Sequence, residues 1–287
     1  MQLLAGGLAL GAIYALVALG FVFVYRATSM INFAQGDMTT AGAFMAYWAV
    51  ADLHLPILVG WLVAMVVLAI IGAVMYYGLY RPLANRSLIS VAIGTLGVAL
   101  VIRGALTVAF GQNPSSLSSP FGNGVVRAGS LVLSLQDVAI IVIVAVLVTV
   151  QAVVLRRTFI GKSLRAISED RDMAQLIGLR VNRLLLGTVV YGAMLAALAG
   201  VLLAPILSVS VSLGWELGLT AFAASIIGGF GSMPGALIGG VLLGIGEEFA
   251  QRYVPGGFAD TAVYGLVLVV LVLRPAGIVS MIAASRA

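Results

Sequence analysis

The stretch RATSMINFAQGDMTTAGAF, residues 26–44, decides how this chain is interpreted. It follows twenty-five residues without a charged side chain and leads into a second apolar segment. Its polar members include Arg26, Asn32 and Asp37, so it predicts either a loop between two membrane helices or polar backbone held at membrane depth. Backbone of the second kind persists only where protein buries it or where it lines a wet cavity.

Composition places the chain among helical membrane proteins. Of its 287 residues, 62% are hydrophobic and 9% are charged, and the mean hydropathy is +1.17. Soluble domains carry about 25% charged residues. Several uncharged runs exceed the roughly 18–20 residues that cross a bilayer as a helix, and continuous rather than alternating apolar runs favour helices over a barrel. We therefore expect an all-α, polytopic membrane helix bundle.

About eight spans are expected, with broken or re-entrant segments among them. The apolar segments cover about 3–25, 38–50, 55–80, 88–110, 136–155, 184–204, 216–252 with an interruption at GGFGSMPG, and 261–273. A Ser-, Gly- and Pro-rich stretch at 111–135 predicts a loop outside the membrane, with a short hairpin. The whole chain, 1–287, is expected to form a single transmembrane domain.

Charge orients the bundle. Segment 156–183 holds seven of the fifteen basic residues and three of the ten acidic ones, which predicts a cytoplasmic location. Counting spans from there places 111–135 outside, 81–86 and the end after Arg274 inside, and the amino terminus outside. The first apolar run lacks a basic leader and is longer than a signal-peptide core, so we expect a retained helix.

Several chemistries are not expected. The chain has no cysteine, which excludes disulfides and thiolate sites, and its single histidine, His54, falls in a short loop. No metal site and no catalytic residue is predicted. Gly161-Lys162-Ser163 resembles part of a phosphate loop, but Arg156 stands where that motif needs its first glycine. The net charge of +5 reflects topology rather than binding of nucleic acid.

A second interrupted segment, ASIIGGFGSMPGALIGGVLLGIGEE at 224–248, lies near the other end of the chain. Paired Gly/Pro interruptions in corresponding halves indicate a transport site and are compatible with an internal inverted repeat. The residues expected to line a substrate pathway are Asn32, Phe33, Gln35, Gly36, Asp37, Gly228, Gly229, Gly231 and Ser232. The alternative for these residues is burial against neighbouring helices.

Glycines and charges within the spans leave further alternatives open. Glycines recur every four residues in three sets, which favours close helix packing over a pathway role. The sets are Gly7 and Gly11, Gly240 and Gly244, and Gly231, Gly235 and Gly239. Charges at Asp37, Arg103, Glu216, Glu247 and Glu248 are expected either to snorkel near span ends or to serve function. Arg103, the most interior of them, is either a structural partner or a pathway residue.

The cytoplasmic segment contains GKSLRAISEDRDMAQLIGLRVNRL at 161–184, which predicts an ordered helix on the inner face. Ser168 is the expected N-cap, followed by acidic residues that complement the helix N-terminus. Gly178 is the expected left-handed stop. Ala166, Ile167, Ala174, Ile177 and Leu179 form the expected apolar side. An ordered surface of this kind favours a docking partner over a solvated loop.

Three motifs together resemble one family: GAIYALVALGFVFVYRATSMINFAQGDM at 11–38, GKSLRAISEDRDMAQLIGL at 161–179 and ASIIGGFGSMPGALIGGVLLG at 224–244. The chain is similar over its whole length to the inner-membrane permeases of branched-chain amino acid (Liv-type) ABC importers, and most of all to their LivH-like branch. One departure is Gln35, where many relatives carry a histidine. A glutamine keeps hydrogen bonding but cannot titrate.

The resemblance implies a bacterial inner-membrane permease that is not itself an enzyme. Its partners would be a second homologous permease (as a heterodimer, with a homodimer as the alternative), two cytoplasmic ATPase subunits, a substrate-binding protein and membrane lipid. ATP and Mg would sit on the ATPase subunits, with no cofactor in this chain. The residues that match the family's coupling motif are Gly161, Lys162, Arg165, Ala166, Glu169, Asp170, Ala174 and Gly178.

The expected mechanism is alternating access, which imports branched-chain amino acids or related small amino acids and amides. Relatives with other substrates carry urea, short amides or aromatic acids. The rival hypothesis is an ion-coupled secondary transporter of small polar solutes, which the broken helices alone would fit equally well. An intramembrane enzyme or signalling subunit is disfavoured because no nucleophile–base pair or metal ligand set lies in facing spans.

Overall fold

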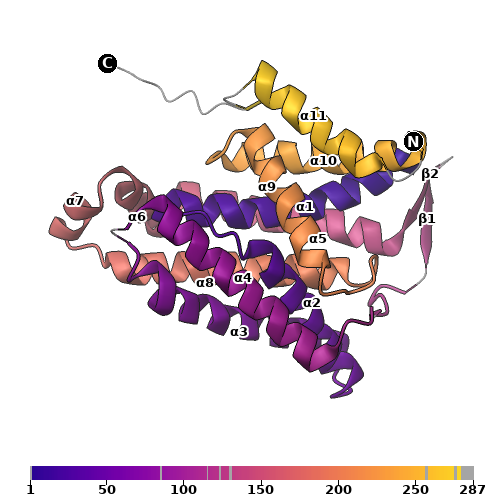
Figure 1. The fold of residues 1–287 in the computed structure, drawn as a ribbon, viewed down its shortest axis with the longest axis horizontal. Helices are drawn as coiled ribbons and strands as arrows, with labels where there is room; N and C mark the ends of the chain where they lie inside the picture. The colour runs from indigo at the N-terminus through magenta and orange to yellow at the C-terminus, as the bar shows by residue number, and fades with distance from the viewer. Residues whose placement is uncertain are drawn as a thin grey trace.

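The computed structural model describes residues 2–84, 86–114, 116–122, 124–128, 131–255, 258–274 and 277–278. The described chain is almost entirely helical, which confirms the all-α class (Figure 1). In order, the elements are α1 (Gln2–Thr28), α2 (Gln35–Ala51), α3 (Ile57–Met75), the π-helical turn η1 (Tyr76–Tyr80), α4 (Leu88–Phe110), β1 (Val125–Ala128), β2 (Leu131–Ser134), α5 (Leu135–Arg157), α6 (Phe159–Glu169), α7 (Arg171–Leu176), α8 (Val181–Leu203), α9 (Leu213–Gly228), α10 (Met233–Tyr253) and α11 (Ala259–Leu273).

Six described helices are long and apolar enough to cross a membrane: α1, α3 with η1, α4, α5, α8 and α10. Two shorter apolar helices, at 213–228 and 261–273, add to them. The number of spans therefore agrees approximately with the expected one. Four boundaries were predicted wrongly by three residues. Helix α1 continues past Tyr25 to Thr28, and α2, α8 and α9 already begin at Gln35, Val181 and Leu213.

Helix α1 is the centre of the bundle, with α5, α8, α9 and α10 packed around it (Figure 1). Of its most apolar 18-residue window, 89% is buried inside the protein, against 17% in α4 and in α5. Hydropathy alone does not distinguish the buried helix from the peripheral ones, since α5 is more apolar than α1. Helices α2 and α3 pack together and against α8, and α2 also contacts α9 and α1.

Glycines set how closely α1 and α10 approach. A Cβ added at Gly11 would lie 2.7 Å from Val241 Cα, and one added at Gly7 would lie 2.7 Å from Ile245 Cα. Gly240 and Gly244 lie equally close to α1 backbone. This confirms close packing as the role of these spacings. Gly231 was wrongly assigned to such a helical row, because it precedes α10 and has a φ of +90°.

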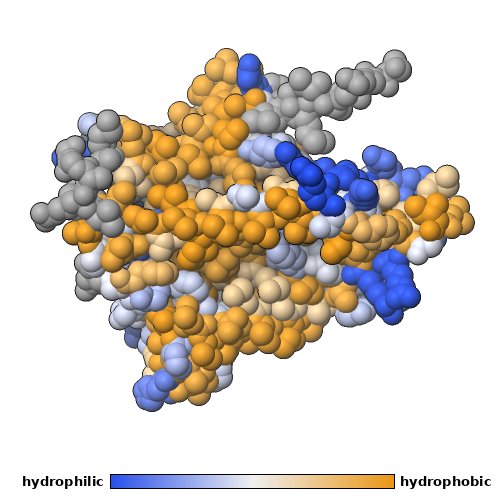
Figure 2. All heavy atoms as spheres, turned by 180° about the vertical axis from the view of Figure 1, so that it is seen from behind, coloured by the Kyte–Doolittle hydropathy of each residue, from blue (hydrophilic) through white to orange (hydrophobic). Residues whose placement is uncertain are grey.

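The β1–β2 hairpin and helices α6 and α7 lie at opposite ends of the bundle (Figure 1). The hairpin β1–β2, in which Val125 pairs with Ser134, confirms the short hairpin expected in the 111–135 loop. Helices α6 and α7 lie at the other end (Figure 1). Figure 2 shows apolar side chains over most of one face, with the largest group of hydrophilic ones toward the α6–α7 end. This separation fits an external hairpin and a cytoplasmic α6–α7.

The cytoplasmic segment forms two helices instead of the single capped one. Ser168 is not an N-cap, because it lies inside α6 and its hydroxyl donates to Arg165 O at 2.8 Å. The cap is Asp170, whose Oδ1 accepts from the N–H groups of Asp172 and Met173, both at 2.9 Å. A carboxylate at a helix N-terminus is favoured by both geometry and dipole. Gly178, with a φ of +85°, confirms the expected left-handed stop.

Candidate translocation and coupling sites

In the first interruption, residues 29–34 between α1 and α2, polar side chains form hydrogen bonds with backbone groups. Thr28 Oγ1 donates to Val24 O at 2.7 Å and accepts from Met30 N–H at 3.1 Å. Asn32 Oδ1 accepts from Ala34 N–H at 3.2 Å, which replaces a helical bond just before α2 begins. Buried backbone groups must be paired within the protein, so these side chains allow the helix to break here.

Two amides hold the interruption in the protein core. Gln35 is 0% exposed and Asn32 is 2% exposed. Gln35 Nε2 donates to Gly192 O of α8 at 3.0 Å, and Gln35 Oε1 accepts from Asn32 Nδ2 at 3.2 Å. Gly20 of α1 leaves the room for this amide, since a side chain there would overlap Gln35 Nε2. The start of α2 is therefore fixed to α8 by a neutral donor and acceptor.

An ion pair fixes the first turn of α2. Arg103 of α4 donates to Asp37 Oδ1 through Nε at 3.0 Å and through Nη2 at 2.9 Å, and to Oδ2 at 3.2 Å. The guanidinium also lies over the Trp215 ring of α9, 5.6 Å from its centroid. Asp37 is only 3% exposed. Of the two roles left open for Arg103, the structure supports that of a structural partner joining α2, α4 and α9.

The second interruption, residues 229–232 between α9 and α10, depends on glycine. Gly229 and Gly231 have φ values of +105° and +90°, which side-chain-bearing residues rarely adopt. Ser232 caps α10 by accepting from Gly235 N–H at 3.2 Å. Gly228 packs directly on Gly235, so α9 and α10 leave the break in close contact.

Aromatic rings connect the two interruptions. Phe222 of α9 packs against Phe33 of the first, at 5.5 Å between centroids, and against Phe230 of the second, at 5.6 Å. Tyr25 at the end of α1 lies 4.6 Å from Phe230. Of these rings, only Phe33 was among the predicted pathway residues. Phe230 stands between glycines in GGFG, and that pattern could have identified it. We call Tyr25, Phe33, Phe222 and Phe230 the aromatic cluster.

The predicted pathway residues are deeply placed in this conformation. Asn32, Gln35, Asp37 and Ser232 are each at most 4% exposed, and only Phe33 is half-buried. The structure thus brings the two interruptions together but gives their polar side chains protein partners. Their contact with substrate stays a prediction.

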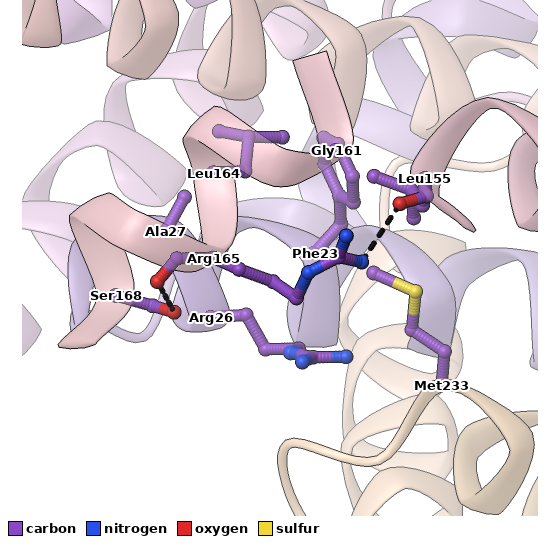
Figure 3. A pocket seen from close by; sticks show the side chains of 9 residues that line it. All are labelled: Phe23, Arg26, Ala27, Leu155, Gly161, Leu164, Arg165, Ser168 and Met233. Carbon is purple, nitrogen blue, oxygen red and sulfur yellow. Dashed lines mark hydrogen bonds between the residues drawn. The ribbon is translucent and has the colours of Figure 1, made fainter. Parts of the chain in front are cut away.

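Helix α6 docks where both interruptions begin or end (Figure 3). A cavity of about 50 Å³ there is lined from α1 by Arg26, from α6 by Arg165 and from α10 by Met233. Arg165 Nη1 donates to Leu155 O, at the end of α5, at 2.9 Å. Gly161 lies against the same carbonyl, leaving no room for a side chain. The first turns of α6 are therefore held by α5 and face the flanks of both interruptions.

The residues of the predicted coupling motif divide between two faces. Gly161 and Ala174 are buried, and Ala166 is half-buried, so these three position the helices. Lys162, Arg165, Glu169, Asp170 and Gly178 are exposed and accessible to a partner. Among the described residues, no group of three or more histidine or acidic side chains is arranged to hold a metal ion.

An exposed apolar patch on α7 was not predicted. Met173, Leu176 and Ile177 are 58%, 80% and 71% exposed. Ile177 was wrongly assigned to the packed side, which Ile167 and Ala174 do occupy at 4% and 1% exposure. The spacing i, i+3, i+4 of the three exposed residues could have revealed the patch. We call Met173, Leu176 and Ile177 the α7 patch.

Comparisons with known proteins agree with this arrangement. A family model described as "Branched-chain amino acid transport system / permease component" matches residues 3–273. The high-affinity branched-chain amino acid transport system permease protein LivH of Escherichia coli is 32% identical, over 97% of this chain and 94% of LivH. BraD of Pseudomonas aeruginosa, a permease protein with the same description, is 31% identical over 97% of this chain and 95% of its own.

A solved structure shares the fold. PsaBC from Streptococcus pneumoniae in complex with Fab matches with a TM-score of 0.53 over 94% of this chain and 91% of the matched one. The sequence identity is 13%, so the likeness concerns the arrangement of helices alone.

Proposed function

Because this chain belongs to the family of branched-chain amino acid transport system permease components, we propose that it forms the transmembrane pathway of an ATP-driven importer. Its proposed cargo is a branched-chain amino acid or a related small amino acid or amide. The chain is a multi-pass protein of the bacterial inner membrane.

The proposed assembly contains two permeases, two cytoplasmic ATPase subunits and an external binding protein that delivers the substrate. The second permease is homologous, and a heterodimer is the proposed form. ATP and Mg act on the ATPase subunits, and this chain contributes no cofactor. The α7 patch and the exposed charges of α6 form the proposed ATPase contact, because apolar residues ringed by charges are typical of an interface core.

One observation carries the proposal: α6 faces both Arg26, three residues before the first interruption, and Met233, one residue after the second. A displacement of α6 by the ATPase would therefore act on both broken segments together. Because the aromatic cluster joins these segments, their separation would open the path between them. This gives a physical route from ATP binding to alternating access.

The test is Leu176→Glu in the assembled transporter. Leu176 is 80% exposed, so the charge leaves folding intact but opposes burial against a partner. We expect ATP hydrolysis stimulated by loaded binding protein to fall at least about tenfold, equivalent to roughly 1.4 kcal/mol. Leu176→Met, which keeps the apolar surface, should retain stimulation. Normal stimulation in a correctly assembled Leu176→Glu complex would remove α7 from the contact.

A further inference from the structure

A second polar cavity, of about 220 Å³, lies at the cytoplasmic end of the bundle. Its walls come from η1 at the end of α3, from α7, from the start of α8 and from Met30 in the first interruption. It is separate from the α6 cavity, with which it shares no lining residue.

One residue that lines this cavity, Tyr80, carries a buried hydroxyl without a partner. Tyr80 is 2% exposed, and among the described residues its hydroxyl has no hydrogen-bond partner. The neighbouring Tyr76 hydroxyl does have one, since it donates to Asn182 Oδ1 at 3.3 Å. A buried hydroxyl normally finds an acceptor, because leaving it unpaired is costly. The Tyr80 hydroxyl is closed off from the accessible surface, so it is an unpaired group beneath the cavity wall and not a group that a bound ligand would contact.

The charges of the cavity agree with an anionic group. Arg81 and Arg171 line it from two different elements. Among the described residues, the ion pair that forms joins Arg103 to Asp37. Arg81 and Arg171 therefore have no described acid within ion-pair distance. Asp172 is the acidic member of the lining. Arginine forks bind carboxylates in a bidentate manner, whereas Asp172 disfavours a dianion such as phosphate.

We propose that this cavity binds a free α-amino acid on the cytoplasmic side. Arg81 and Arg171 would hold its carboxylate, and Asp172 its ammonium group. Met30 and Leu185, which also line the cavity, offer an apolar surface to the side chain. The choice of an amino acid over another zwitterion rests on the proposed function. Since the ligand would connect α7 to the first interruption, accumulated product would slow further transport.

The experiment measures equilibrium binding of radiolabelled leucine to the assembled transporter without ATP, in nanodiscs of phosphatidylcholine. We expect saturable binding with which leucine amide and inorganic phosphate do not compete. Arg81→Gln and Arg171→Gln should each weaken binding about tenfold, as loss of a charge-assisted bond predicts.

Two matched controls separate this cavity from the rest of the surface. Arg86→Gln removes a nearby exposed arginine, and Tyr77→Phe removes the hydroxyl of a 56% exposed neighbour, neither of which lines the cavity. Both should bind leucine as the unmodified protein does. No leucine binding, equal competition by the amide or by phosphate, or equal affinity in the cavity and control variants would each overturn the proposal.

Uptake into proteoliposomes, measured in parallel, distinguishes this proposal from the proposed function. Leucine binding that depends on Arg81 and Arg171 without ATP-driven amino acid uptake would uphold the site and reject the transport function. Amino acid uptake without such binding would reject the site alone.

Discussion

For the ion pair between Asp37 and Arg103, we predict that removing one partner lowers the unfolding free energy more than removing the other. Asp37→Asn and Arg103→Gln each remove one charge, but the charges left behind differ in environment. The Asp37 side chain is 4% exposed, whereas the Arg103 side chain is 30% exposed and lies over the Trp215 ring. The guanidinium keeps the Trp215 ring as a partner, while the buried carboxylate keeps the first turn of α2.

The magnitudes follow from these exposures. Arg103→Gln leaves a buried, uncompensated carboxylate and should cost about 3–5 kcal/mol of unfolding free energy. Asp37→Asn leaves a partly exposed cation over an aromatic ring and should cost about 1–3 kcal/mol, the range for a lost charge-assisted bond. The double variant leaves no unpaired charge, so it should be more stable than Arg103→Gln alone. The coupling free energy of the cycle should be about 1–3 kcal/mol.

The assay is thermal unfolding in one detergent, followed by circular dichroism and by loss of the monodisperse peak. At roughly 2–4 °C per kcal/mol, Arg103→Gln should unfold at least about 6 °C below the unmodified protein. The required order of stability is the unmodified protein, then Asp37→Asn, then Arg103→Gln, with the double variant above the last. Additive costs, or an Asp37→Asn variant less stable than Arg103→Gln, would refute the assignment of a buried carboxylate held by a partly exposed arginine.

Two further predictions concern packing and the buried amide. Gly240→Leu should prevent stable association of α1 with α10, because a Cβ there would already lie 2.5 Å from Ala15 Cα. Gly246→Leu should express and unfold normally, because no atom of the described residues lies within 4 Å of a Cβ at that position. Equal yields and melting temperatures for both variants would contradict the close approach. Gln35→Leu should lower the unfolding free energy by about 1–3 kcal/mol because Gly192 O loses its donor, and chemical denaturation that shows no loss would mean that this bond contributes nothing.

Hydropathy and charge predicted much of the fold for simple physical reasons. A long apolar run has few alternatives to a membrane helix, and arginines after α5 determine which end faces the cytoplasm. Hydropathy could not show that α1 is central and α5 peripheral, since both are apolar throughout. That difference comes from small residues such as Gly7 and Gly11, whose effect depends on the helix opposite.

The candidate site was predicted less completely. The two interruptions were found because glycine and polar residues stand out within apolar sequence. The pairing of Asp37 with Arg103, 66 residues apart, could not be predicted because each charge alone resembles one that reaches toward a span end. The cap at Asp170 was missed in favour of Ser168 because both residue types cap helices and only the backbone conformation at Asp170, with φ −151° and ψ 113°, decides between them.

The central claim is that the ATPase acts on the broken helices through α6 and α7, and a spin label at Ser29→Cys tests it most directly. Ser29 is an exposed residue of the first interruption with a φ of +58°, and the chain has no native cysteine that would compete for the label. We predict that ATP binding to the assembled transporter changes the mobility of this label, and that Leu176→Glu removes the change. A label whose spectrum is the same with and without ATP, in a complex that hydrolyses ATP and imports substrate, would contradict the account.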